Sequence, residues 1–218
     1  MKENSSQQLH MLRYTLTEQL IHGMEVSNLA YDLARELGYE KEICYELAKA
    51  GVLHDIGKIV LENYVEEQDT LVVEEMRFVR THSTLGYELL QGRGYSDFVL
   101  ESILYHHENA NGSGPFGKTW EEIPLFSRII HLSDLLDRAY GAKGFTEDIF
   151  NKACGYLHKN EGTVVDKECV DAFLQAFPLP HFLTLGEDSF EKTLWEKIPR
   201  IKQELSFAQI KELARFFA

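Results

Sequence analysis

The segment GVLHDIGK, residues 51–58, places a histidine and an aspartate side by side where an apolar helical pattern stops. Because this pattern has helical spacing, we predict a helix from about Glu40 to Asp55, followed by Gly57 at a helix end. His54 and Asp55 then sit at the end of a helix. Imidazole and carboxylate groups are ligands that borderline divalent metals select. The segment therefore raises the hypothesis of a metal site whose remaining ligands come from elsewhere in the chain.

Helical periodicity continues on both sides of this segment. It predicts further helices over residues 9–38, 72–92, 97–107, 124–140 and 146–158, with Gly38 as a helix stop and Thr146 as an N-cap. We find no alternating strand pattern and no internal repeat. The predicted fold class is all-α. We expect one helical domain over residues 1–180 and a C-terminal helical extension over residues 181–218, packed on the core or on a partner in a homodimer.

The composition is that of a soluble globular protein, with 218 residues, of which 44% are hydrophobic and 26% charged. No apolar run reaches the roughly 20 residues that cross a bilayer, and the N-terminal MKENSSQQLH lacks the apolar core of a signal peptide. We therefore expect a cytoplasmic protein without a membrane partner. The three cysteines are widely separated, which favours reduced thiols over disulfides.

The formal net charge of -13 disfavours a nucleic-acid polymer as partner, because binding to its backbone requires a basic surface. A small anionic ligand remains compatible with this charge if a local feature supplies positive charge. A metal site would be such a feature.

A second group of histidines precedes a turn-rich loop in YHHENANGSGPFG, residues 105–117. Adjacent residues on a helix point about 100° apart, so one apolar face does not explain both His106 and His107. A lone histidine on a helix is more often a core or surface residue than a ligand. Here, however, an HD pair, a later His82, an HH pair and a later Asp134 follow one another at predicted helix edges. The conjunction favours a polynuclear metal site.

With these motifs in order, the sequence resembles the HD superfamily of metal-dependent phosphohydrolases, and specifically its HD-GYP branch, which degrades cyclic dinucleotides. The resemblance covers about Glu18 to Phe173. The segments that carry it are HGMEVSNLA from His22, GVLHDIGK from Gly51, THSTLGYELL from Thr81, HHENANGSGP from His106, EEIPLFSRIIHLSDLLDR from Glu121, and EGTVVDKECVDAFL from Glu161.

The resemblance implies an HD-domain helical bundle and a set of metal ligands. These ligands are His22, His54, Asp55, His82, His106, His107 and Asp134. Asp55 would bridge two divalent ions, with iron or manganese favoured by the histidine-rich ligand set. Some family members hold a third ion through a glutamate one turn before the first histidine, and Glu18 occupies that position. His131 stays outside the predicted ligand set, although it could orient Asp134 from one turn away.

The family chemistry assigns catalytic roles to Asp55 and Lys58. Two neighbouring ions hold a hydroxide that attacks phosphorus, and the bridging carboxylate fixes both ions. Lys58 lies four residues after His54, so its ammonium group would reach a non-bridging phosphate oxygen. The alternative is a solvated lysine after a helix end.

The substrate loop departs from the family pattern. The branch carries Gly-x-Gly-Tyr-Pro after His-His-Glu and three residues, whereas Gly112, Ser113 and Gly114 are followed directly by Pro115, so the tyrosine is missing. We still expect Gly112, Gly114 and Pro115 to contact substrate. Where the family places an arginine after the aspartate ligand, this chain has Lys143, a point charge in place of a bidentate group.

The preferred function is thus a metal-dependent phosphodiesterase that hydrolyses a cyclic dinucleotide, with cyclic di-GMP preferred, through a metal-bridged hydroxide. One alternative is an HD-superfamily phosphohydrolase for another nucleotide. A second is a weak or inactive module that binds a nucleotide or a signalling protein, which the altered loop and the usual attachment of such domains to sensors motivate. A third is an all-α domain with scattered histidines.

Overall fold

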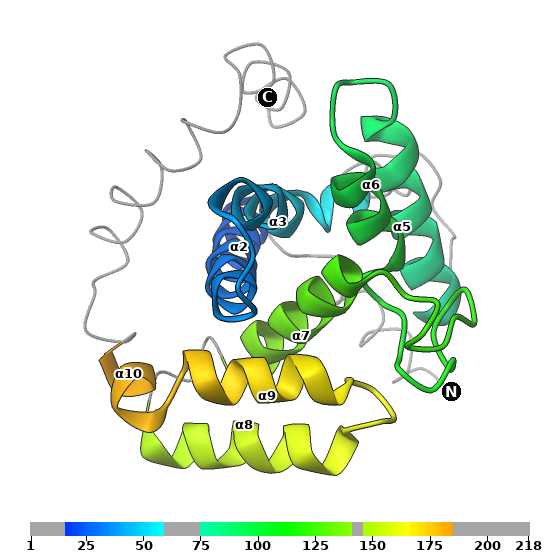
Figure 1. Ribbon diagram of the computed structural model, residues 1–218. Coiled ribbons are helices and arrows are strands. Elements are labelled where there is room, and N and C mark those ends of the chain that lie inside the picture. Colours follow the sequence, from blue (N-terminus) through cyan, green and yellow to red (C-terminus); the bar gives the residue numbers. More distant parts are fainter. Residues whose placement is uncertain (1–15, 59–74, 141–145, 185–218) are drawn as a thin grey trace.

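The computed structural model describes residues 16–58, 75–140 and 146–184, and these form eight α-helices (Figure 1). In chain order they are α2 (Leu16–Glu36), α3 (Lys41–Leu53), α5 (Glu75–Leu90), α6 (Asp97–Tyr105), α7 (Leu125–Tyr140), α8 (Glu147–Asn160), α9 (Lys167–Ala176) and α10 (Leu179–Thr184). The described residues contain isolated β-bridges but no strand. The all-α prediction is confirmed.

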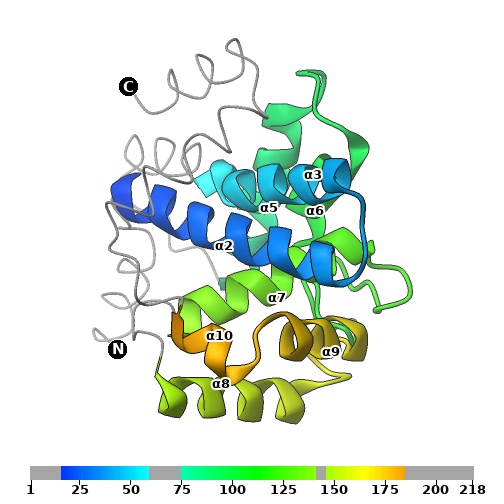
Figure 2. The same ribbon diagram turned by 60° about the vertical axis from the view of Figure 1, so that its left-hand side comes forward.

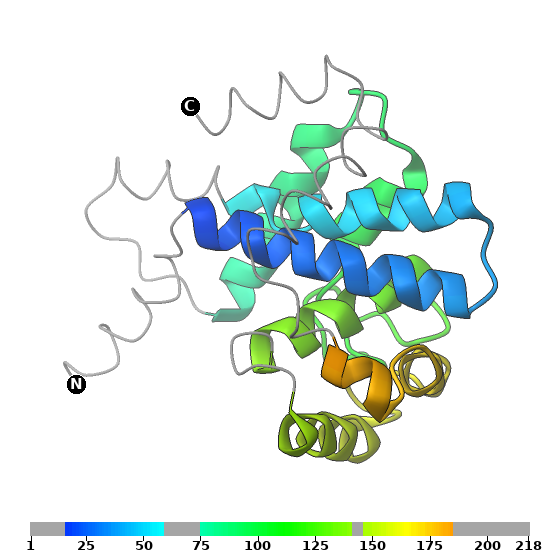
Figure 3. The ribbon, with the colours of Figure 1, turned by 90° about the vertical axis from the view of Figure 1, so that its left-hand side faces the viewer.

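Helices α2 and α3 lie side by side and run in opposite directions (Figure 3). They approach closely because α3 carries Gly51 at the contact: a Cβ atom on this residue would lie 2.6 Å from the Cα atom of Ser27 on α2. A side chain of any size would therefore separate the two helices. Their close packing brings the His22 and His54 rings to 5.0 Å between centroids.

Helix α7 lies between the α2–α3 pair and the layer formed by α8 and α9 (Figure 2). Its side chains therefore face packed neighbours, and Ile129, Ile130 and Leu132 are fully buried. Leu33 of α2 and Phe173 of α9 belong to the same hydrophobic core. Burial of such side chains contributes roughly 1.5–3 kcal/mol each, so the core holds α7 firmly and with it the polar residues on its length.

Most predicted helices occur close to the expected bounds. Helix α2 ends two residues before Gly38, whose φ of 80° suits a residue without a Cβ atom. The Thr146 side chain accepts a hydrogen bond from the backbone N–H of Ile149, as an N-cap does. Residues 9–15 of the first predicted helix lie outside the described part.

One expectation about helices was wrong, and one helix was missed. Helix α3 ends at Leu53, close to the expected bound, but residues 56–58 are helical again, so Gly57 does not terminate a helix. Its role is spatial, because a Cβ atom at Gly57 would lie 1.9 Å from the carbonyl oxygen of His82. Helix α9 was missed, although Asp166 caps it by accepting from the Cys169 N–H.

No helix in the described ranges is long and apolar enough to cross a membrane. Within the proposed extension over residues 181–218, the structure describes only the end of α10, and residues 185–218 lie outside the described part. The division at residue 180 and the cytoplasmic location therefore remain predictions.

Candidate metal centre

Five helices bring the seven predicted ligand side chains to one place. They are His22 on α2, His54 at the C-cap of α3 with Asp55 after it, His82 on α5, His106 at the C-cap of α6 with His107 after it, and Asp134 on α7. At both helix ends the chain turns, and the two consecutive side chains there both reach the cluster. The His-Asp and His-His pairs both use this geometry.

The seven residues form two groups of four that share one aspartate. Asp55, His82, His106 and His107 make the first group, and His22, His54, Asp55 and Asp134 make the second. Within each group, one ligand atom from every residue lies within 4.8 Å of the others. A carboxylate has two oxygens, so Asp55 is able to serve both groups at once.

The histidine rings are held with one nitrogen turned toward the cluster. The Nδ1 atoms of His54, His82 and His106 lie 2.7, 3.1 and 2.6 Å from the backbone carbonyl oxygens of Gly51, Phe78 and Ile103. A carbonyl oxygen only accepts, so each Nδ1 carries the proton and donates it. The Nε2 atom of each neutral ring is then an unprotonated donor atom for a metal.

Asp137 orients His22 in the same way, and its role was not predicted from the sequence. Nδ1 of His22 lies 2.6 Å from Oδ2 of Asp137 across 115 residues of chain. A carboxylate on the far nitrogen fixes the ring and increases the basicity of the nitrogen that faces a metal. The sequence signal was the three-residue spacing from Asp134 on the same helix face.

Two polar atoms in the cluster, His54 Nε2 and Asp55 Oδ1, are buried without a hydrogen bond in the protein, whereas Nε2 of His22 lies 2.9 Å from Oδ1 of Asp134. In the other group, the Nε2 atoms of His106 and His107 approach Nε2 of His82 to 3.4 and 3.1 Å. Burying unpaired polar atoms and opposed nitrogen lone pairs is costly. A cation at each group would satisfy these atoms, so the residues present fit divalent metal ions.

Burial lowers the pKa of His82, His106 and His107, and brings that of His106 to about 3. These rings are therefore neutral near pH 7, which is the form that binds metal. Burial also acts on His54, but Asp55 and Asp134 outweigh it and raise the pKa of His54 to about 9. A metal ion at the second group would therefore displace a proton from His54 near pH 7, and the same two carboxylates would favour the ion.

Asp55 and Asp134 remain ionised although burial opposes their charge. Lys58, His54 and Arg138 hold the pKa of Asp55 well below its ordinary value, and Arg138 and His22 do the same for Asp134. Lys58 donates from Nζ to Oδ2 of Asp55, so the predicted catalytic lysine is at the cluster. Arg138, which was not singled out from the sequence, contacts both aspartates.

Glu108, the third residue of the His-His-Glu motif, organises the loop after α6 rather than joining the cluster. Its buried carboxylate accepts hydrogen bonds from the backbone N–H groups of Phe116 at 2.7 Å and Lys118 at 2.6 Å. Gly114 lies against Glu108 so closely that a Cβ atom would come within 2.7 Å of Oε1. The chain therefore wraps around one carboxylate, which explains the small residues in this motif.

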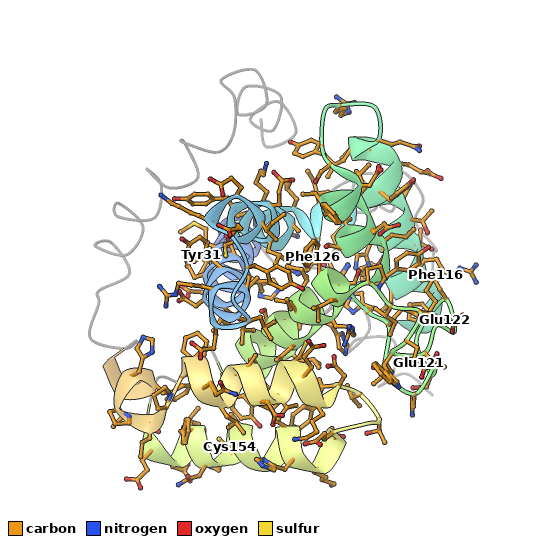
Figure 4. All side chains as sticks on the ribbon, viewed as in Figure 1. Tyr31, Phe116, Glu121, Glu122, Phe126 and Cys154 are labelled. Atoms are coloured by element: carbon orange, nitrogen blue, oxygen red, sulfur yellow. The ribbon has the colours of Figure 1, made fainter. Side chains whose placement is uncertain are left out.

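Loop residues 109–119 project on the side of α5 and α6, where Phe116, Glu121 and Glu122 mark the path of the chain (Figure 4). The Phe116 ring packs on Tyr105, with 5.5 Å between centroids, and on the Arg80 guanidinium. The nearest neighbours of Gly112 are Thr119 and Gly117, and those of Gly114 are Glu108 and Asn109. The predicted substrate contacts of Gly112, Gly114 and Pro115 stay predictions.

Three further sequence predictions have different outcomes. Lys143 lies outside the described residues, and Glu18 lies in α2 at a position whose side chain is not described. His131, left unassigned from the sequence, donates from Nδ1 to the backbone carbonyl oxygen of His106 at 2.8 Å. It therefore fixes the backbone of a predicted ligand instead of orienting Asp134.

Comparisons with known proteins show the family to which the chain belongs. A family model described as "HD domain" matches residues 4–169. The cyclic di-GMP phosphodiesterase response regulator RpfG of Xanthomonas campestris pv. campestris is 34% identical over 155 residues, which are 69% of this chain and 41% of that protein. The chain thus spans about two fifths of the length of this relative.

Two solved structures share the fold. A cyclic GMP-AMP specific phosphodiesterase of V. cholerae, V-cGAP3, superposes with a TM-score of 0.66 at 18% identity, over 90% of this chain and 53% of the other. An HDG"Y"P protein of Bdellovibrio bacteriovorus, Bd1817, gives a TM-score of 0.54 at 18% identity, over 86% and 59%. Since the family model matches well over half of the sequence, this chain belongs to the HD-domain family.

Proposed function

We propose that this protein is a metal-dependent phosphodiesterase that opens a cyclic dinucleotide, with cyclic di-GMP as the preferred substrate. The observation that carries the proposal is the pair of four-residue groups sharing Asp55, with histidine Nε2 atoms turned inward by bonds at Nδ1. Its similarity to RpfG, a cyclic di-GMP phosphodiesterase, supports the substrate class.

The two groups would hold two divalent ions, and the histidine-rich set with a shared carboxylate favours iron or manganese. A third ion would use Glu18. When bound, the ions supply an activated water and positive charge for displacement at phosphorus. Phosphodiester hydrolysis requires the activated water and the positive charge at the same phosphate. Asp55, shared by the two groups, would hold the two ions close enough together for this.

The protein's own residues prepare this chemistry. Backbone carbonyl oxygens hold the rings of His54, His82 and His106 in one tautomer, which costs no reorganisation when a ligand binds. Full burial of His54 and His106 excludes bulk water and strengthens the local electrostatic field. Lys58, held by Asp55 in the same cluster, would bind a non-bridging phosphate oxygen.

Product analysis tests the proposal. Protein loaded anaerobically with Fe(II) or Mn(II) would be incubated with cyclic di-GMP, 3'3'-cGAMP and bis(p-nitrophenyl) phosphate. We expect cleavage of a cyclic dinucleotide to linear or mononucleotide products, and its loss in Asp55→Ala. Asp148→Ala is the matched control, because Asp148 is an exposed aspartate on α8 paired with Lys152. Metal-loaded protein that cleaves none of the three substrates would overturn the proposal in favour of a binding module.

A further inference from the structure

Arg138 lies across the solvent side of the metal cluster. It stands one turn after Asp134 on α7, donating from Nε to Oδ1 of Asp134 at 2.6 Å and from Nη2 to Oδ2 of Asp55 at 2.7 Å. The Arg138 side chain is 32% exposed, against 3% for Asp134 and 11% for Asp55. The guanidinium group thus lies between the buried carboxylates and solvent, where an incoming ligand would meet it.

Arg138 and Lys58 meet at one atom. Both side chains donate to Oδ2 of Asp55, Lys58 from the helical turn at residues 56–58 and Arg138 from α7. Two like charges stay this close only while an anion lies between them. Oδ2 also lies within 3.4 Å of His54 Nε2 and 3.7 Å of His22 Nε2, so it belongs to the second group of candidate ligands. A metal ion at that group would compete with the two cations for this oxygen.

From this arrangement we propose that Arg138 is a phosphate-binding residue that also competes with metal for Asp55 and Asp134. Without metal, its guanidinium neutralises the two aspartates. With metal on the aspartate oxygens, the contacts of Arg138 and Lys58 to these carboxylates would weaken, and the phosphate of a diester substrate is an anion that both side chains would then bind. This inference rests on the proposed function, since it assigns a substrate contact at the same site.

An arginine suits this role for chemical reasons. Its guanidinium group stays charged at any working pH and presents a planar fork of N–H donors that matches two oxygens of a carboxylate or a phosphate. In Arg138 the fork already spans two carboxylate oxygens. The same fork would span two oxygens of one phosphate, which the ammonium group of Lys58 does not do.

Other side chains after Asp134 do not fill this role in the described part of the chain. The Thr146 hydroxyl is neutral and caps α8. Lys152 pairs with Asp148 on an exposed face. Among the basic residues after Asp134 that the structure describes, Arg138 contacts both aspartates of the cluster.

The test measures metal and substrate binding separately. Mn(II) affinity is measured from the EPR signal of free Mn(II), and the bis-phosphorothioate analogue of cyclic di-GMP is titrated by calorimetry into Mn(II)-saturated protein. For Arg138→Ala we expect Mn(II) to bind at least about fivefold more tightly and the analogue at least about tenfold more weakly, as for loss of a charge-assisted hydrogen bond. Arg138→Gln, of similar size, should show the same signs. Arg138→Lys should retain part of the analogue affinity.

Arg35→Ala is the matched control, because Arg35 is exposed on α2 and pairs with Asp32 away from the cluster. It should change neither affinity. Weaker or unchanged Mn(II) binding in both Arg138→Ala and Arg138→Gln would overturn the competition. Unchanged analogue binding in these variants, with clear binding to the parent protein, would overturn the phosphate contact alone. Failure of the parent protein to bind the analogue would overturn the phosphate contact together with the proposed function.

Discussion

Hydrogen bonds at Nδ1, the ring nitrogen that faces away from the cluster, fix the orientation of four histidine rings. His54, His82 and His106 each donate a hydrogen bond from Nδ1 to a backbone carbonyl oxygen three or four residues earlier in the chain. These bonds are local, so each of the three rings is oriented by its own helix and not by a neighbouring one. His22 differs, because its partner is the Asp137 carboxylate on another helix. A ring held by backbone keeps its direction when a metal ion arrives or leaves.

Glu108 offers a residue-scale prediction. In Glu108→Gln, one of the two acceptor oxygens becomes an N–H₂ group facing a backbone N–H, either of Phe116 or of Lys118. We expect the free energy of unfolding to fall by about 2 kcal/mol, the cost of a lost charged hydrogen bond and a buried donor without an acceptor. Urea denaturation followed by circular dichroism measures it.

Glu121→Gln is the control for this prediction. Glu121 lies in the same connection between α6 and α7 but is exposed. Its substitution should change stability by less than about 0.5 kcal/mol. Equal effects of the two substitutions would show that Glu108 does not organise the loop.

At this scale the sequence predicted which residue types would gather but not how they are held. Motif order and the family resemblance it supports were enough to bring His22 and Asp134 into one hypothesis. The pairings of Asp137, Arg138 and His131 join residues 115, 83 and 25 positions apart, and no local pattern encodes such contacts. They follow from helix packing, which the sequence alone did not give.

Among the helices, close backbone approach sets the position of the cluster. Residues 56–58 lie against α5 because Gly57 has no side chain, and the same contact brings Asp55 to 3.4 Å from His82 Nε2. A Cβ atom at Gly57 would meet the His82 carbonyl oxygen, which is backbone and does not move aside. The glycine in the HDxGK pattern thus has a packing role.

Gly57→Ala should therefore displace α5 from the His-Asp turn. We expect loss of more than about 2 kcal/mol of stability, as for overpacking against rigid backbone, together with weaker metal binding. Thermal denaturation monitored by circular dichroism and Mn(II) titration measure the two effects.

Gly155→Ala is the matched substitution with the opposite expectation. Gly155 is exposed in the middle of α8, and a Cβ atom there meets nothing within 4 Å. Alanine should stabilise the protein by up to about 1 kcal/mol through helix propensity. A Gly57→Ala protein as stable as the parent would contradict the packing role.

Helix periodicity predicted most elements because apolar residues recur in the sequence at the spacing of one buried helix face. It failed at Gly57. The sequence pattern predicted a helix end there, whereas in the structure Gly57 lies within a helical turn and allows close contact with the backbone of His82. It also passed over α9, although the Asp166 cap was present in the sequence. Tertiary packing, not local propensity, decided the first case, whereas α9 carries a local signal in its cap.

In the whole molecule, the cluster lies where α2, α3, α5, α6 and α7 meet, so its ligands come from segments far apart in the chain. An unfolded chain does not hold these groups together. Ions bound to the native state should therefore stabilise the whole fold, by about 2.7 kcal/mol at each site when their free concentration is 100 times Kd.

Metal removal is accordingly expected to lower the melting temperature of the parent protein. Differential scanning fluorimetry with and without a chelator measures the shift. Asp55→Ala should show little or no shift, because it lacks the residue common to both groups. A chelator response of equal size in the two proteins would place the stabilising metal elsewhere.

The most direct test of the two-group metal centre is the metal content of protein purified without an affinity tag under anaerobic, reducing conditions, measured by inductively coupled plasma mass spectrometry. The shared-aspartate geometry predicts about two ions per chain in the parent protein. It predicts about one in His107→Ala, which alters a single group, and none retained in Asp55→Ala. A parent protein without metal, or an Asp55→Ala protein that keeps its full metal content, would contradict the account.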